Sequence, residues 1–200
     1  KPDPMIKSQL ISFGTSGHRG TSFDRSFNED HILAVTQALC EYRIEHGITG
    51  KLFIGMDTHA LSLSALKTAI EVLSANEVEV RYQADLGFTP TPVISHAILT
   101  TNNNKKSELA DGIVITPSHN PPQDGGFKYN PPSGGPAGTE ITNQIQSRAN
   151  EILKNGLSGV KKVQFDQALN KENVKAYDFM MPYIEDLTNV IDLERIREAG

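Results

Sequence analysis

The most chemically suggestive stretch of this 200-residue sequence is residues 116–130, which read Thr-Pro-Ser-His-Asn-Pro-Pro-Gln-Asp-Gly-Gly-Phe-Lys-Tyr-Asn. Its three prolines restrict the backbone and its paired glycines permit close approach to a ligand, so we expect a rigid loop that can enclose one. The hydroxyl of Ser118 would stand at the tip and could accept a phosphoryl group. His119, Asn120 and Lys128 supply donors that could stabilise the transferring anion. Phosphoryl transfer is therefore one chemistry open to this loop.

Ser118 also has two plainer interpretations. In a proline-rich turn its hydroxyl could simply cap a backbone group, and for an isolated Ser-His pair that would be the favoured interpretation. A serine hydrolase would need a Gly-x-Ser-x-Gly elbow, which the sequence lacks, and adjacent residues such as Ser118 and His119 do not usually point at one another. The hydrolase is excluded, whereas the capping turn must be weighed against the rest of the chain.

A second stretch, residues 13–20, reads Phe-Gly-Thr-Ser-Gly-His-Arg-Gly and is also suited to anions. It offers three glycines, the hydroxyls of Thr15 and Ser16, and Arg19, whose guanidinium can hold two phosphate oxygens at once. The glycine spacing alone is neither a P-loop nor a complete dinucleotide fingerprint. Two such loops in one small chain favour phosphate chemistry over the capping turn.

Alternating apolar patterns predict the elements that would position these loops. Residues 28–46 repeat apolar side chains at helical spacing, with an apparent capping box at residues 26–29 and a glycine at the end. Shorter apolar runs of strand length alternate with further helical patterns. This βαβαβ succession predicts an α/β fold: a layered αβα domain with a mostly parallel or mixed sheet, whose ligand site lies after the carboxyl ends of the strands. We expect strands at 52–56, 78–83 and 112–116, and helices at 28–46, 62–76, from 90, at 139–155 and at 177–189.

Charge and composition exclude several functional classes. The net charge of −5 argues against a nucleic-acid partner, which would require clustered Lys and Arg. No apolar run approaches the roughly 18 residues of a membrane helix and the first residues lack a signal-peptide core, so we expect no membrane partner and a cytoplasmic location. The single cysteine, Cys40, cannot form an intrachain disulfide. The histidines and the cysteine show no metal-ligand spacing, so a metal would need other ligands.

With these motifs in view, the sequence closely resembles the α-D-phosphohexomutase superfamily. In that family a Thr-x-Ser-His-Asn-Pro loop, matched here at 116–121, carries a phosphoserine, and a Gly-Thr-x-Gly-x-Arg-Gly loop lies beside it. Residues 55–58 and 87–92 match two further family loops in order and spacing. Residues 16–20, 57–62 and 128–132 look like the bacterial phosphoglucomutase branch. The sequence departs from the pattern at Met56 and His59, where many relatives carry basic residues, arginine in the second case.

The resemblance implies interconversion of glucose 1-phosphate and glucose 6-phosphate through glucose 1,6-bisphosphate, which would act as intermediate and activator. Ser118 would carry the phosphoryl group, and that phosphate would bind Mg²⁺ together with ligands outside this chain. Arg19 would contact the phosphoserine and His119 would stabilise the transfer site. Lys128 would act as general acid/base or as an electrostatic stabiliser, because a free amine titrates near about 10.4. The phosphate-binding residues would be Thr15, Ser16, His18 and Asn120.

The same resemblance implies a domain organisation. The family has four domains, with magnesium binding in the second and sugar choice in the third. Residues 1–184 would form domain I, which bears the phosphoserine, with its outgoing linker, and 185–200 would begin domain II. The 200 residues alone are therefore expected to fold without completing mutase turnover. The alternatives are another phosphohexomutase acting on mannose, glucosamine or pentose phosphates, or a noncatalytic module that binds a phosphosugar.

Overall fold

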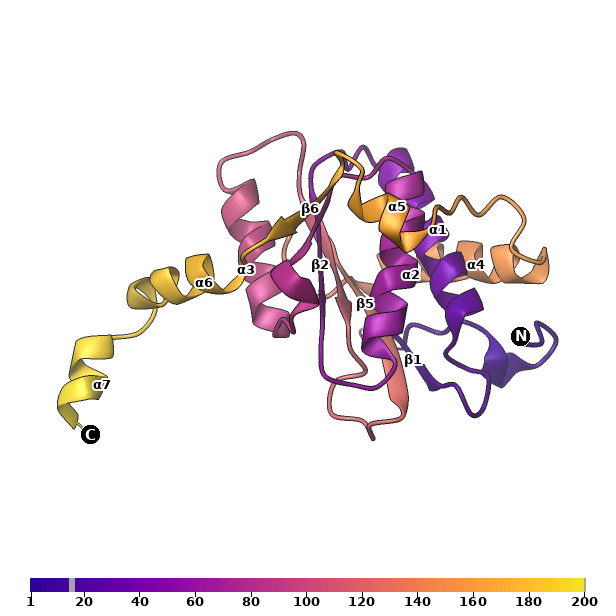
Figure 1. Ribbon diagram of the computed structural model, residues 1–200, viewed down its shortest axis with the longest axis horizontal. Coiled ribbons are helices and arrows are strands. Elements are labelled where there is room, and N and C mark those ends of the chain that lie inside the picture. The colour runs from indigo at the N-terminus through magenta and orange to yellow at the C-terminus, as the bar shows by residue number, and fades with distance from the viewer. Residues whose placement is uncertain (15–16, 200) are drawn as a thin grey trace.

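The computed structural model describes residues 1–14 and 17–199, which fold around one mixed β-sheet (Figure 1). Among these residues the sheet has six strands in the order β1-β5-β4-β2-β3-β6. The strands are β1 (His18–Thr21), β2 (Leu52–Met56), β3 (Val80–Gln83), β4 (Asp111–Ile115), β5 (Asp124–Asn130) and β6 (Val174–Tyr177). The α-helices are α1 (Glu29–Glu45), α2 (Ser62–Ala75), α3 (Thr91–Asn102), α4 (Thr139–Lys154), α5 (Phe165–Leu169), α6 (Met180–Asp186) and α7 (Leu193–Ala199), and the 3-10 helices are η1 (Lys7–Gln9), η2 (Ala84–Leu86) and η3 (Leu187–Asn189).

The sheet has a parallel half and an antiparallel edge. Strands β4, β2, β3 and β6 run parallel to one another, and in the centre Ile54 of β2 pairs with Ile113 of β4. Strand β5 runs antiparallel to β4 on one side and to β1 on the other. The predicted succession from β2 through α2, β3 and α3 to β4 is confirmed, with crossover helices between parallel strands as such connections require.

Helices cover both faces of the sheet, so the expected αβα layering is confirmed (Figure 1). Side chains alternate along each strand, so Ile54 faces the helices α1, α2, α4 and α5, while Phe53 faces α3 and α6. Burial of an apolar side chain such as Leu39 of α1, which is fully enclosed, stabilises the fold by about 1.5–3 kcal/mol. The larger core therefore lies between the sheet and the α1 layer.

Helix α1 begins one residue later than expected, and its cap differs from the predicted one. Asn28 is the N-cap: its side-chain oxygen accepts from the backbone N–H of Asp30 at 3.1 Å. The return contact comes from His31, whose Nδ1 accepts from the backbone N–H of Asn28 at 3.3 Å. Histidine thus takes the place that Glu or Gln usually has in a capping box. The box predicted at 26–29 was therefore placed too early in the chain.

Three strands lie where the sequence indicated none. Strands β1 and β5 occupy parts of the two glycine-rich stretches that we expected to be loops throughout, and β6 was not predicted. Because Tyr177 ends β6, the helix expected from residue 177 begins only at Met180. The boundary expected between residues 184 and 185 falls inside α6 and stays a prediction.

Helix α7 stands apart from the sheet in Figure 1, and its described side chains are exposed. Among the described residues, no helix has the length and apolar character needed to cross a bilayer.

Candidate functional site

Ser118 lies at the exposed tip of the loop that leaves β4 at its carboxyl end. Its φ of 93° is in the left-handed region, which non-glycine residues adopt only when the surrounding structure holds them there. The backbone N–H of Ser118 donates to Thr116 Oγ1 at 2.9 Å, and the N–H of Thr116 donates to the carbonyl of Gly126 at 2.9 Å. The loop is therefore tied back onto β5, with the Ser118 hydroxyl presented outward.

Lys128 of β5 points its amine at that hydroxyl. Its Nζ lies 3.2 Å from Ser118 Oγ, within hydrogen-bonding distance. Burial lowers the pKa of Lys128 below its ordinary value, the nearby charge of Arg19 lowers it further, and Asp57 opposes them. A lysine whose proton is held less tightly than usual therefore contacts the oxygen that would carry the phosphoryl group.

Arg19 reaches the same region from β1. Strand β1 pairs with β5 so that Arg19 lies opposite Gly126, two positions from Lys128 along β5. Gly17 is needed for this approach, because a Cβ there would come within 2.5 Å of the Phe127 carbonyl oxygen and 2.7 Å of Lys128 Cγ. The antiparallel edge of the sheet thus brings the two glycine-rich stretches together, as the phosphate-chemistry hypothesis requires.

Gly126 has a different role from the close approach to a ligand that we expected. It lies within β5, and a Cβ on it would meet the carbonyl oxygen of Thr116 and lie 2.6 Å from Pro117 Cα. Its missing side chain lets the loop of Ser118 fold closely over the strand. The two glycines at 125–126 therefore permit close packing within the protein, Gly125 against the Phe27 ring and Gly126 against the backbone of Thr116 and Pro117.

A third loop, after β2, joins the loop of Ser118. The ring of His59 contacts the Asp57 carboxylate through Nδ1 at 2.7 Å and the Asn120 carbonyl oxygen through Nε2 at 2.9 Å. The hydroxyl of Ser62, at the start of α2, donates to Asp57 at 2.6 Å. The sequence marked position 59 as a departure from the family pattern but did not indicate this contact across 61 residues.

The remaining predicted site residues differ in their exposure to solvent and in their contacts. His119 is exposed beside Ser118, and the Asn120 side chain donates to Asp124 at 3.0 Å. His18 is buried, with its ring stacked on Phe27 and His31, and burial lowers its pKa to about 4. Its assignment to phosphate binding stays a prediction. The assignments of residues 15 and 16, a threonine and a serine, lie outside the described residues.

The magnesium expected from the resemblance would find only part of its coordination here. Within residues 1–14 and 17–199 no group of three or more His, Cys, Asp or Glu side chains is arranged to hold a metal. The Ser118 hydroxyl is exposed, so a phosphoryl group on it could offer oxygen to an ion from the solvent side. The donor set fits a metal ligated through the phosphoserine, with further ligands from elsewhere.

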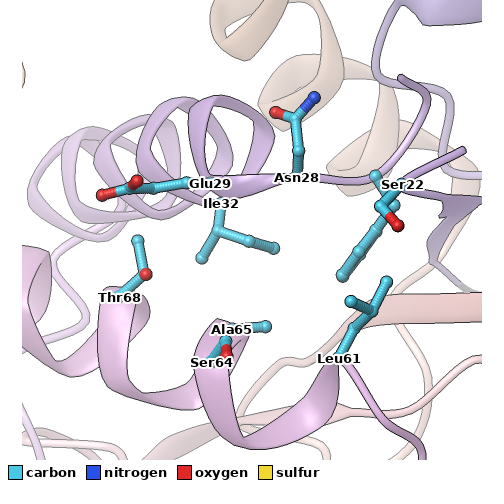
Figure 2. A pocket seen from close by; sticks show the side chains of 9 residues that line it. Ser22, Asn28, Glu29, Ile32, Leu61, Ser64, Ala65 and Thr68 are labelled. Atoms are coloured by element: carbon cyan, nitrogen blue, oxygen red, sulfur yellow. The ribbon is translucent and has the colours of Figure 1, made fainter. Parts of the chain in front are cut away.

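A separate cavity of about 230 Å³ lies between the first turns of α1 and α2 (Figure 2). Figure 2 shows Ile32 of α1 and Ala65 of α2 facing each other across it. Leu61 also lines it, and the preceding residue, Ala60, donates its N–H to the Pro122 carbonyl at 3.3 Å. The cavity therefore flanks the loop of Ser118 from the helix side without reaching the hydroxyl. Its lining consists of Ser22, Phe27, Asn28, Glu29, Ile32, Leu61, Ser64, Ala65 and Thr68.

Comparisons with known proteins agree with this geometry. Residues 10–156 match the family model described as phosphoglucomutase/phosphomannomutase, alpha/beta/alpha domain I. The chain belongs to the phosphoglucomutase/phosphomannomutase family, within the α-D-phosphohexomutase superfamily, so the resemblance seen in the sequence is confirmed.

Similarity to individual proteins adds detail. The chain is 58% identical over all its 200 residues to a phosphoglucomutase of Komagataeibacter xylinus, covering 36% of that protein. It is 28% identical to a phosphoglucosamine mutase of Prochlorococcus marinus, with 94% of this chain and 36% of the relative covered. A crystal structure of a Thermus thermophilus protein superposes with a TM-score of 0.73 at 26% identity, covering 97% of this chain and 38% of that one. The chain thus spans about a third of the length of the curated relatives it matches.

Proposed function

We propose that the protein containing this chain is a phosphoglucomutase, which interconverts glucose 1-phosphate and glucose 6-phosphate, and that Ser118 carries the phosphoryl group between half-reactions. The observation that carries the proposal is the 3.2 Å contact of Lys128 Nζ with the exposed Ser118 Oγ, at the tip of a loop held in a strained conformation. The choice of glucose rests on the 58% identity to the Komagataeibacter phosphoglucomutase, against 28% to the phosphoglucosamine mutase.

In the proposed first half-reaction, a sugar hydroxyl attacks the phosphorus of phosphorylated Ser118. The new P–O bond forms to the sugar as the bond to Oγ breaks, and Oγ leaves with the electron pair. Lys128, whose pKa is lowered by burial and by Arg19, donates a proton to that oxygen as the serine is regenerated, and the proton released by the attacking sugar hydroxyl restores the charge of Lys128. The product is glucose 1,6-bisphosphate, and the reverse transfer from its other phosphate completes the interconversion.

Arg19 and Lys128 together place positive charge beside the loop. Both enter from the antiparallel edge of the sheet, so their positions do not depend on the loop itself. Fixed charges of this kind stabilise the transferring anion without reorganising during the reaction. A magnesium ion bound through the phosphate on Ser118 would offset further negative charge, with its other ligands supplied from outside this chain.

Two further parts of the proposal concern substrate and location. The partner would be a small phosphosugar, bound with its reacting hydroxyl towards the phosphate on Ser118. We place the protein in the cytoplasm, in line with the cytoplasmic phosphoglucomutases named among its relatives, such as that of Mesembryanthemum crystallinum at 27% identity.

Phosphopeptide mapping tests the proposal. The full-length protein, incubated with glucose 1,6-bisphosphate, should carry phosphate on Ser118, and Ser118→Ala should carry none. Arg19→Lys should lower mutase turnover at least about tenfold, since a lysine offers a point charge in place of a bidentate fork. Coupled assays with glucose, mannose, glucosamine and pentose phosphates would identify the sugar. Phosphate found reproducibly on another serine, with Ser118 bare, would overturn the assignment.

A further inference from the structure

The ring of His59 is held between two hydrogen-bond acceptors. Nδ1 faces the Asp57 carboxylate at 2.7 Å and Nε2 faces the Asn120 main-chain carbonyl at 2.9 Å. A carbonyl oxygen can only accept, and an ionised carboxylate can only accept. A neutral imidazole carries one N–H, so it can satisfy one of these contacts and leaves the other with two facing lone pairs. The two contacts are satisfied together only when both ring nitrogens carry a hydrogen.

The carboxylate partner is itself fixed and ionised. Although burial alone would raise the pKa of Asp57, hydrogen bonds from Ser62, Thr116 and His59 outweigh it and lower that pKa below its ordinary value. The backbone N–H of Asp57 donates to the Ile115 carbonyl at 3.0 Å, at the end of β4. Asp57 is therefore a rigid anchor that joins the first turn of α2 to the sheet.

We propose that His59, as a doubly protonated imidazolium, is a positioning residue of the phosphoryl-transfer site, tying the loop of Ser118 to the anchor formed by Asp57. This tie consists of the two ring contacts of His59, and it reaches the loop at Asn120, two residues beyond Ser118. A residue at a φ of 93° persists only where its surroundings hold it, and the tie supplies that restraint on the far side of the loop. The proposal deepens the proposed function, because it concerns the geometry of the same serine.

The charges around the ring favour its protonated form. The Asn120 carbonyl raises the pKa of His59 most, burial opposes it, and Asp57 and Asp124 raise it further. The charge of Asp57 also acts on Lys128, whose pKa it raises against the larger lowering by burial and Arg19. As the pH rises through the raised pKa of His59, one ring hydrogen is lost and with it one of the two contacts. The tie should therefore weaken on the alkaline side, above the ordinary histidine pKa of 6.5.

Arginine at this position provides the informative comparison. Its guanidinium offers several N–H donors and stays charged at all relevant pH values, so His59→Arg should keep both contacts without titrating. In His59→Gln the amide donates from one end only and presents an acceptor at the other, so one contact is lost at every pH. His46→Gln is the matched control, because His46 is an exposed histidine at the end of α1.

The experiment has one spectroscopic and one kinetic part. Nitrogen-15 NMR of histidine-labelled protein should show both His59 ring nitrogens protonated at pH 7, and amide exchange in residues 118–120 should rise in His59→Gln but not in His46→Gln. In the full-length protein, phosphoryl transfer to Ser118 from glucose 1,6-bisphosphate should fall at least about tenfold in His59→Gln. The alkaline loss of rate at the NMR-measured pKa should be present in wild type and absent in His59→Arg.

Two results would overturn the inference. The first is a neutral His59 ring at pH 7. The second is a His59→Gln protein whose transfer rate, pH profile and loop exchange match those of wild type. A protonated ring with faster loop exchange in His59→Gln, in a wild-type protein without mutase activity, would uphold the tie and refute the proposed function instead.

Discussion

Replacing Gly126 by alanine tests whether contact with β5 holds the loop of Ser118 in place. The added Cβ would lie 2.5 Å from the carbonyl carbon of Thr116 and 2.6 Å from Pro117 Cα, and it would overlap the Thr116 carbonyl oxygen. All of these are backbone atoms, so no side-chain rotation can relieve the overlap. The 2.9 Å hydrogen bond from Thr116 N to the Gly126 carbonyl spans the same gap and would lengthen.

The size of the effect follows from these distances. Carbon atoms in contact prefer separations of about 3.5–4.0 Å, so the loop must move by about 1 Å away from the strand. Overpacking of this kind costs about 1–3 kcal/mol, and a weakened backbone hydrogen bond costs about 1 kcal/mol more. We therefore expect the free energy of unfolding to fall by about 2–4 kcal/mol. A displacement of about 1 Å at a transfer site also costs roughly a hundredfold in rate.

Urea unfolding with linear extrapolation measures the first quantity, and phosphorylation of Ser118 in the full-length protein measures the second. Gly135→Ala is the matched control, because a Cβ at Gly135 meets nothing within 4 Å. We expect the control to keep wild-type stability and transfer rate. Equal unfolding midpoints and equal transfer rates for the Gly126→Ala and Gly135→Ala proteins would refute the argument that strand packing positions the serine.

Three further outcomes follow from particular contacts. Lys128→Met should slow phosphoryl transfer about 10- to 150-fold in a rapid-quench assay, the equivalent of one charge-assisted hydrogen bond, with an unchanged melting temperature. Arg43→Met removes the cation 3.0 Å from the buried carboxylate of Asp111 and should lower the free energy of unfolding by about 3–5 kcal/mol, whereas Arg148→Met in an exposed pair should change it by less than about 1 kcal/mol. Burial lowers the pKa of His18 from 6.5 to about 4, so between these pH values the unfolded chain binds a proton that the folded protein does not. The free energy of unfolding should therefore fall by about 3 kcal/mol as the pH falls from 6.5 towards 4. Urea unfolding at pH 7 and pH 4 should show a smaller acid loss for His18→Phe, and equal losses would contradict this.

The parallel half of the sheet could be predicted because its signals are local. The helix at 62–76 and the strand at 52–56 were expected from apolar spacing and found within one residue of their observed ends. Burial on both faces makes such strands read as continuous apolar runs. The layered αβα fold followed from their alternation.

The antiparallel edge could not be predicted in the same way. Strand β5 contains Gly125 and Gly126, which favour a turn when only the sequence is considered. They fit a strand because Phe27 packs against the first and the Thr116 backbone against the second, and neither contact is indicated by the neighbouring residues in the sequence. Strand β1 is four residues long and also contains a glycine, so it carries no clear alternation. Tertiary contact outweighs local preference at each of these places.

The candidate site likewise contains residues that the sequence could predict and contacts that it could not. Ser118, Arg19 and Lys128 could be singled out from their residue types and neighbours. The contact of His59 with Asn120 could not, because nothing in either segment indicates that the His59 ring meets the Asn120 carbonyl. Residue type suggested the chemistry, whereas the fold determines which side chains restrain it.

The pairing of β1 with β5 also affects how the chain folds as it is synthesised. Thr21 pairs with Asp124, so β1 leaves the ribosome about a hundred residues before its only sheet neighbour among the described strands. At about 5–20 residues per second, that interval is roughly 5–20 s. During it, Arg19 provides a charge on a short unpaired strand, a feature that discourages pairing with other chains. The arginine assigned to phosphate would thus first protect the nascent chain, and the site would be completed only when β5 is inserted between β1 and β4.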